Sequence, residues 1–270
     1  MHKIIEKKKL AINITLLKVE APLVVRGARP GQFVIVRLDE YAERIPLTIC
    51  DTDKSGGVIT LIIQELGRST KDLCALNAGG RIRDILGPLG NPSEIDKFGT
   101  VVMIGGGVGS AELYTVVRAL KDKGNKVITI LGARCKDLVI LEDEFRKLAD
   151  EVIITTDDGS YGMKGLVTDG LKKLFERGEK IDRIICCGPI PMMKAATLTA
   201  KPKAIPTVVS LNAILLDATG MCATCRCTVG GKTYFSCVDG PEFDGYKVDF
   251  DELLHRNRRF LEEEKRALES

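Results

Sequence analysis

The chain has 270 residues, about the length of two domains, and its 44% hydrophobic content is enough for ordinary buried cores. Forty Lys and Arg stand against 37 Asp and Glu, with five Tyr, eight Phe and no Trp, so neither charge nor aromatic content indicates nucleic-acid binding. No run approaches the roughly 18 apolar residues that span a bilayer, and the N-terminus lacks an unbroken signal-peptide core. These features predict a cytoplasmic protein with no nucleic-acid or membrane partner.

Residues 1–96 form the first predicted domain, in which short apolar runs alternate with turn residues. The clearest runs are LAINITLLKV (10–19), GQFVIVRL (31–38) and GVITLIIQEL (57–66). Closely spaced strands that are rich in Val and Ile are typical of a small antiparallel barrel. We therefore predict a β-barrel at the N-terminus.

Strands and helices alternate in the second predicted domain, residues 97–210. TVVMIGG (100–106) indicates a buried strand, residues 111–123 have helical periodicity, and KVITILGAR (126–134) indicates the next strand. Such alternation predicts a parallel sheet covered by helices on both faces. The predicted fold class is therefore α/β plus β.

Four of the nine cysteines lie in residues 211–246, a segment too small to bury a core unaided. Because an odd number of cysteines cannot pair completely, metal or redox chemistry is favoured over disulfides. Three of the four share a pattern with an acidic residue, Asp217-x4-Cys222-x2-Cys225-x11-Cys237. Plant-type [2Fe–2S] ferredoxins use Cys-x4-Cys-x2-Cys and a distant fourth cysteine. The segment is predicted to be an iron–sulfur lobe with a carboxylate in the first ligand position.

Two alternatives to this ligand set stay open in the sequence. Cys227 follows Cys225 by two residues, so in an extended segment its side chain shares the same face and could replace Asp217 as the fourth ligand. The same thiolates could instead hold a structural zinc ion in a binding module. Four other cysteines are predicted to be packed side chains, namely Cys50, Cys74, Cys135 and Cys186.

Residues 247–270 are predicted to form a C-terminal helix with charges on most of its surface. Its other side carries Phe250, Leu253, Leu254, Asn257, Phe260, Leu261 and Leu268. The pattern leaves open whether this side packs on the chain itself or on a partner.

Glycines follow three of the predicted parallel strands. GGGVG (105–109) separates a strand from a helix, where bare backbone can approach a pyrophosphate. Ligands of open parallel sheets bind at the carboxyl ends of the strands, so the three loops predict one nucleotide site. The candidate nucleotide-binding residues are Gly105, Gly106, Gly107, Gly109, Arg134, Asp158, Gly159, Gly188 and Pro189.

The barrel offers polar groups for a second phosphorylated cofactor. RIPLT (44–48) carries a cation and a hydroxyl, and GRST (67–70) carries hydroxyls and a glycine amide. Beside a cluster and a nucleotide domain, such groups indicate a flavin. The candidate flavin-binding residues are Arg44, Pro46, Leu47, Thr48, Gly67, Ser69 and Thr70.

Taken together, the motifs resemble the ferredoxin-reductase-like flavoproteins across nearly the whole chain. They are PGQF (30–33), RIPLT, GPLGN (87–91), GGGVG, DDGSYGMKG (157–165), CGP (187–189), and MCATC (221–225) followed by CVDGP (237–241). The resemblance implies an FAD-binding barrel, an NAD(P)-binding domain and a [2Fe–2S] lobe that exchanges electrons with a larger subunit. It also implies Thr48 beside the flavin ring and Cys187 beside the nicotinamide as the catalytic residues.

Two groups of iron–sulfur subunits within this family are similar to the chain. The dihydroorotate dehydrogenase subunit has cysteine where this chain has Asp217. The small subunit of the NADH-dependent reduced ferredoxin:NADP oxidoreductase, an electron-bifurcating transhydrogenase, resembles the chain in having aspartate there. That resemblance implies a heterodimer or larger assembly with an iron–sulfur flavoprotein, which reacts with ferredoxin. A second departure is that the family's usual flavin arginine stands where this chain has Ile45, one residue after Arg44.

Electron counting gives the expected order of the cofactors. NADH delivers two electrons as hydride and an iron–sulfur cluster accepts one at a time, so we expect FAD to stand between them. The family resemblance implies NAD(H). Arg134 leaves NADP(H) open, because a 2′-phosphate needs an arginine near this strand end.

Overall fold

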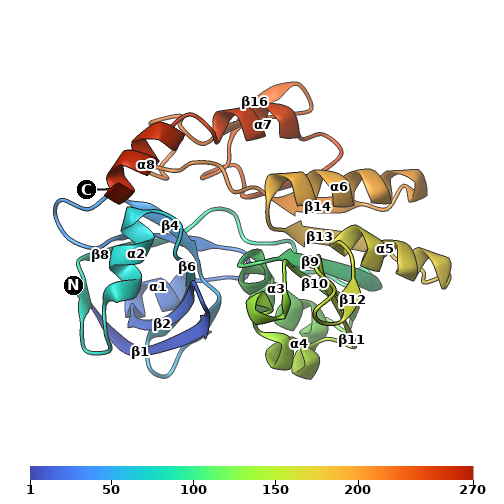
Figure 1. Cartoon of the computed structure of the whole chain (residues 1–270), viewed down its shortest axis with the longest axis horizontal. Coiled ribbons are helices and arrows are strands. Elements are labelled where there is room, and N and C mark those ends of the chain that lie inside the picture. The colour runs from blue at the N-terminus through green and yellow to red at the C-terminus, as the bar shows by residue number, and fades with distance from the viewer. Residues whose placement is uncertain (270) are drawn as a thin grey trace.

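The computed structural model describes residues 1–269, which form an N-terminal β domain, a central α/β domain and a C-terminal lobe (Figure 1). In the N-terminal domain one antiparallel sheet has the order β5-β6-β2-β1-β7 and the other the order β4-β3-β8. The bounds are β1 His2–Ala11, β2 Ile14–Glu20, α1 Pro22–Gly27, β3 Phe33–Arg37, β4 Ile45–Thr48, β5 Asp51–Asp53, β6 Val58–Gln64, α2 Arg68–Ala75, β7 Arg81–Ile82 and β8 Asp84–Leu89.

Both N-terminal sheets enclose one hydrophobic core. Leu17 of β2, Ile59 of β6 and Val34 of β3 are fully buried in the same cluster. Successive side chains of a strand point to opposite faces, so an apolar residue at every second position is enough to fill this core. The predicted antiparallel N-terminal domain is thereby confirmed.

The central domain is built on a seven-stranded sheet of order β12-β11-β10-β9-β13-β14-β17, parallel except at β17. Its elements are β9 Thr100–Gly106, α3 Gly109–Asp122, β10 Lys126–Ala133, η1 Lys136–Leu138, α4 Glu142–Leu148, β11 Glu151–Thr156, β12 Met163–Lys164, α5 Val167–Glu176, β13 Arg183–Cys187, α6 Ile190–Ala200, η2 Lys201–Lys203 and β14 Thr207–Ser210. Helices α3 and α4 cover one face and α5 and α6 the other, because β9 alternates Val101 and Met103 with Val102 and Ile104 toward two separate cores. The predicted parallel-sheet domain is confirmed.

The C-terminal lobe consists of loops, one hairpin and two helices. The hairpin pairs β15 Arg226–Val229 with β16 Lys232–Phe235, and β17 Glu242–Asp244 then joins the edge of the central sheet. The single helix expected over residues 247–270 is two helices, α7 Phe250–Arg256 and α8 Leu261–Glu269. Helix α7 packs on β15 and α6, so this half of the tail packs on the chain itself and not on a partner. Helix α8 lies beside α2 (Figure 1).

Within residues 1–269, none of the helices combines the length and the apolar character that a bilayer crossing requires.

Candidate functional site

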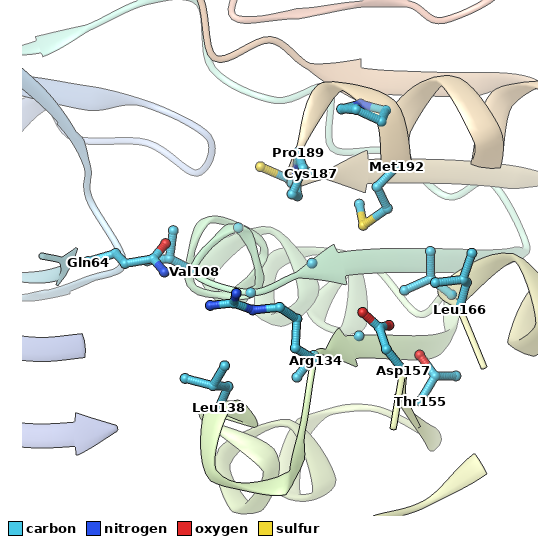
Figure 2. A pocket seen from close by; sticks show the side chains of 18 of the residues that line it. Gln64, Val108, Arg134, Leu138, Thr155, Asp157, Leu166, Cys187, Pro189 and Met192 are labelled. Carbon is cyan, nitrogen blue, oxygen red and sulfur yellow. The ribbon is translucent and has the colours of Figure 1, made fainter. Parts of the chain in front are cut away.

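A cleft of about 660 Å³ lies between the N-terminal and central domains (Figure 2). It opens at the carboxyl ends of the parallel strands, whose register brings the predicted loops together. Gly106 of β9 pairs with Gly132 of β10, and Cys187 of β13 pairs with Gly105. The barrel supplies the opposite wall, including Gln64. This is the edge of an open parallel sheet where ligands bind.

Glycine is needed after β9 because the loops of the cleft pack closely. A Cβ at Gly109 would lie 2.7 Å from the backbone oxygen of Cys187, and a Cβ at Gly106 would overlap Sδ of Met192. Gly107 has a positive φ of 57°, and no atom lies within 4 Å of its Cβ position. The turn therefore presents bare backbone to the cleft at the start of α3, as an approaching phosphate group requires.

Six of the nine predicted nucleotide-binding residues line the cleft. They are Gly106, Gly107, Gly109, Arg134, Gly188 and Pro189. The other three do not line it. Gly105 packs against α3, since a Cβ there would lie 2.8 Å from Cα of Ser110. Asp158 accepts a 2.7 Å hydrogen bond from the Ser160 hydroxyl in a surface turn with Gly159, and its neighbour Asp157 lines the cleft instead.

The charged side chains of the cleft lie at separate places. Figure 2 shows the guanidinium of Arg134 extending toward Gln64 and Val108, while the carboxylate of Asp157 lies closer to Leu166. The cation is thus available on the side of the barrel, and the anion stands at the end of β11.

A smaller cavity of about 170 Å³ lies where the three parts of the chain meet. Its lining includes Pro46, Leu47 and Thr48 from the barrel, Glu112 and Ser210 from the central domain, and Leu215, Ser236 and Pro241 from the lobe. The predicted flavin residues of β4 therefore line the same cavity as residues of the central domain and of the C-terminal lobe.

Glu112 lines both cavities, and sequence reasoning missed it. The Cys187 thiol donates a 2.8 Å hydrogen bond to Oε2 of Glu112, and the hydroxyls of Thr48 and Ser210 bond to the same side chain. Burial raises the pKa of the Glu112 carboxyl, while these hydrogen bonds lower it. Burial and then the charge of Glu112 raise the pKa of Cys187 well above its ordinary value. The only sequence signal was a carboxylate in the first turn after the glycine loop.

Side chains of β4 alternate between two faces, and this affects whether position 44 or position 45 is suited to an arginine that contacts a flavin. Ile45 packs against the barrel core, whereas Pro46 and Thr48 lie on the side of the small cavity. Arg44 is exposed and, two residues before Pro46, precedes the strand on that same side. Ile45 also lines the cavity beside α2 that contains Ser69, whereas Arg44 lines neither that cavity nor the two described above, so the contact of Arg44 with a flavin phosphate stays a prediction.

The GRST segment forms the start of α2. The Thr70 hydroxyl bonds the Gly67 N–H and carbonyl over 3.1 and 2.9 Å, and thus closes the helix terminus. Ser69 lines a neighbouring cavity of about 410 Å³ together with Tyr41 and Arg68. Of the three predicted residues in this segment, Ser69 lines this cavity, and Gly67 and Thr70 do not.

The four predicted iron–sulfur ligands lie in two pairs. The sulfur atoms of Cys225 and Cys237 are 3.2 Å apart and buried. Asp217 accepts the backbone N–H of Cys222 over 2.8 Å. Nowhere in residues 1–269 are three His, Cys, Asp or Glu side chains arranged around one point as a single metal ion requires. A [2Fe–2S] cluster takes two protein ligands on each iron, so paired donors fit it better than they fit a zinc ion, which needs four donors at one point.

Cys227, the rival fourth ligand, is buried within β15, and its sulfur lies 3.8 Å from the backbone oxygen of Tyr234. Burial and then Cys225 raise its pKa to about 12. Asp217 is near enough to Cys237 that its charge, after burial and Cys225, contributes to raising the pKa of that thiol to about 12. Both candidates therefore lie near one of the predicted thiolate ligands, and Asp217 as the fourth donor stays a prediction.

The loop carrying the ligands holds two strained residues. Ala218 and Ala223 have positive φ values of 59° and 54°, where a Cβ is disfavoured. Such strain is concentrated at functional loops. It occurs here directly after Asp217 and directly after Cys222.

Known protein families match two parts of the chain. The iron–sulfur cluster binding domain of dihydroorotate dehydrogenase B matches residues 212–249, and the oxidoreductase NAD-binding domain matches residues 103–197. A Thermotoga maritima homolog of the dihydroorotate dehydrogenase B (NAD(+)) electron transfer subunit is 48% identical, over 100% of this chain and 95% of that protein. The Fusobacterium nucleatum electron transfer subunit of dihydroorotate dehydrogenase B is 32% identical, over 91% and 96% of the two chains.

Solved structures of oxidoreductases are also similar to this chain. A structure of the NADH-dependent reduced ferredoxin-NADP oxidoreductase, described for flavin-based electron bifurcation, contains a chain 48% identical to this one. Its TM-score is 0.95, and the match covers 100% of this chain and 97% of that chain. A cytochrome P450 reductase of Amycolatopsis, 23% identical with a TM-score of 0.64 over 75% of this chain and 65% of that chain, shares the fold.

These findings confirm the predicted cofactor set of FAD, a [2Fe–2S] cluster and NAD(H), and an oxidoreductase subunit of a larger assembly. The chain belongs to the ferredoxin-reductase-like family of iron–sulfur electron-transfer subunits that includes those of dihydroorotate dehydrogenase B.

Proposed function

We propose that this protein is the NAD(H)-binding electron-transfer subunit of an electron-bifurcating NADH-dependent reduced ferredoxin:NADP oxidoreductase. The proposal is carried by the small cavity that all three parts of the chain line. Glu112 connects this cavity to the nucleotide cleft, and Ser236, the neighbour of Cys237, connects it to the lobe. A cofactor against Thr48 is then within reach of a nicotinamide on one side and of the cluster on the other.

The nucleotide is held mainly by backbone. The turn Gly106, Gly107 and Gly109 meets the phosphates at the start of α3, and Gly188 and Pro189 border the reactive end beside Cys187. Arg134 serves the adenosine half, near the barrel. Oε2 of Glu112 keeps the Cys187 thiol oriented and protonated at this position.

The barrel holds the flavin through Thr48 at the ring and through Arg44 and Ser69 at the phosphates. When bound, the flavin supplies the conversion between hydride transfer and single-electron transfer. The roles of the chain are to orient the ring against Thr48 and to keep water out of the junction. Leu47, which packs against the barrel core, and Leu215 from the lobe supply apolar walls for this purpose.

The partner docks at the exposed end of the lobe. Cys222 is exposed, and an exposed apolar residue neighbours each ligand region in sequence: Leu216 before Asp217, Met221 before Cys222 and Val238 after Cys237. Met221 is 86% exposed, which is costly unless another surface covers it. We infer that the larger iron–sulfur flavoprotein subunit covers this end.

Asp217 favours the bifurcating enzyme over dihydroorotate dehydrogenase. The resemblance to the dihydroorotate subunits implies a cysteine at that position, where this chain has Asp217. Dihydroorotate oxidation remains the second candidate, because the matched iron–sulfur domain family carries that enzyme's description. A cytoplasmic location suits both functions, since none of the nine cysteines of residues 1–269 forms a disulfide.

The test is activity of the complex purified anaerobically with its larger subunit. We expect flavin, iron and acid-labile sulfide, and NADPH-driven reduction of ferredoxin that depends on added NAD⁺. Dihydroorotate-dependent reduction of NAD⁺ instead would establish the second candidate. A colourless preparation containing zinc would contradict both.

A further inference from the structure

Three arginines of the C-terminal lobe gather beside the loop between Cys222 and Cys225. Arg256 at the end of α7 and Arg259 just after it donate hydrogen bonds to the backbone oxygen of Thr224, over 3.4 and 3.2 Å. Arg226 begins β15, on which α7 packs (Figure 1). The tail therefore brings positive charge directly against the loop that carries two of the proposed ligands.

Arg256 is a buried cation without an anionic partner. It is 9% exposed, its Nε atom has no hydrogen-bond partner, and no carboxylate in residues 1–269 lies within ion-pair distance of it. Burial, followed by the charges of Arg259 and Arg226, lowers its pKa. The carboxylate of Glu252, one turn earlier on α7, opposes this shift by raising the pKa of Arg256, but it forms no ion pair with Arg256 and keeps a buried oxygen without a hydrogen-bond partner.

Such an arrangement costs free energy unless a negative group lies close by. Gathering like charges and burying one of them is unfavourable, and buried charges in proteins are normally compensated. The negative group that the chain itself implies is an iron–sulfur centre with three thiolates and one carboxylate. Its formal charge is negative and falls by one further unit on reduction.

We propose that Arg256, assisted by Arg259 and Arg226, is a charge-compensating positioning group that raises the reduction potential of the cluster. The proposal rests on the proposed function only in requiring the [2Fe–2S] centre. A fixed positive charge stabilises the reduced cluster, which is more negative, more than it stabilises the oxidised cluster. Solvent ions screen this interaction least where the cation is buried. The hydrogen bonds to Thr224 hold the loop between Cys222 and Cys225 against the same guanidinium groups.

The proposal assigns a role to the tail that lies beyond the matched iron–sulfur domain, which ends at residue 249. These arginines also balance the negative charge of the proposed ligand Asp217 without themselves binding iron. The potential of the centre is then set jointly by Asp217 and by residues about 40 positions later in the chain.

The experiment compares midpoint potentials of the cluster by electron paramagnetic resonance in redox-titrated complex. We expect a lower potential in Arg256→Gln, a smaller decrease in Arg259→Gln, and a value near wild type in Arg256→Lys, which keeps the charge. Arg258→Gln is the matched control, because Arg258 is an exposed arginine of the same segment that does not bond Thr224. A role limited to holding the loop would instead lower iron content in Gln and Lys variants alike.

Equal potentials in Arg256→Gln and Arg258→Gln would overturn the proposal. If Arg256→Gln loses its iron, Arg259→Gln decides: a potential below that of Arg258→Gln supports the proposal, and an equal potential overturns it. Failure of the proposed function gives a different result, because the wild-type complex would then lack NAD⁺-dependent ferredoxin reduction while the cluster signal and the arginine effect persisted.

Discussion

The nucleotide cleft lies at the ends of hydrogen-bonded strands of a seven-stranded sheet, whereas the ligands of the cluster lobe lie in loops around one two-stranded hairpin. In the cleft, close approach of backbone segments fixes the loops, as at Gly109 against Cys187. In the lobe, Ala218 and Ala223 are strained and Arg256 is buried without an anion. Packing of the chain itself therefore holds the cleft in place, while the lobe needs a bound centre to offset the free-energy cost of its strain and buried charge.

Removing the centre should therefore have the largest effect, and only on the lobe. In Cys225→Ser we expect loss of most iron and hydrogen exchange at residues 211–249 faster by about tenfold or more, because metal binding contributes folding free energy there. Strands β9 and β10 should keep their protection. Mass-spectrometric hydrogen exchange measures both regions. Cys50→Ser, a buried cysteine of a different core, serves as control and should keep its iron.

A substitution at Gly109 should damage the cleft while sparing the cluster. In Gly109→Ala the new Cβ meets the rigid backbone of Cys187 and Gly188, so the loops must separate at a cost of about 1–3 kcal/mol. NADH affinity should fall by about ten- to a hundredfold, measured by calorimetric titration. Iron content should not change. Gly27→Ala, where the Cβ would make only a 3.5 Å contact with Pro88, should bind NADH normally; equal losses in both variants would refute the close-packing explanation.

The two regions also differ in what their sequence could predict. Strand β9 was predictable because a continuous apolar run followed by glycines has few other structural solutions. The loop at Gly106 and Gly107 followed from it, since backbone geometry decides such sites. The ligand spacing from Asp217 to Cys237 identified the lobe equally well, because the chemistry of a two-iron centre restricts the donors.

Contacts between distant segments could not be predicted in the same way. Glu112 acquires its environment from Thr48, Cys187 and Ser210, which lie on three other segments of the chain. The break between α7 and α8 was missed because helical periodicity continues through it in the sequence. Asp158 was chosen over Asp157 since a loop's sequence does not show which of two adjacent carboxylates turns toward the cleft.

The stability of the junction between the two cavities should depend on pH through the buried carboxyl of Glu112. Burial raises the pKa of Glu112 above its ordinary 4.5, so well below that value the folded and unfolded chains are both protonated there. As pH rises, the Glu112 carboxyl loses its proton first in the unfolded chain. The free energy of unfolding of the wild type therefore falls relative to that of Glu112→Gln, until the pH exceeds the pKa of Glu112 in the folded chain. The loss amounts to about 1.4 kcal/mol for each unit by which the pKa is raised.

Thermal unfolding of the two proteins across a pH series measures this difference. Their melting temperatures should diverge above pH 4.5 and then run parallel. Asp143→Asn provides a control on an exposed carboxylate of α4. A divergence of the same size in that variant would show that Glu112 is not the responsible group.

Replacing Cys227 should have the smallest effect. Cys227→Ala removes one buried sulfur from the core, at a cost of about 1 kcal/mol. It should leave the iron content and the electron paramagnetic resonance spectrum unchanged, because we propose Asp217 as the fourth donor. Asp217→Cys, in contrast, should keep the cluster but change both the spectrum and the potential, since thiolate replaces a harder oxygen donor. Loss of iron in Cys227→Ala, together with an unaltered spectrum in Asp217→Cys, would transfer the ligand role to Cys227. The paired donors of the lobe would then have to rearrange around β15, where Cys227 now faces Tyr234.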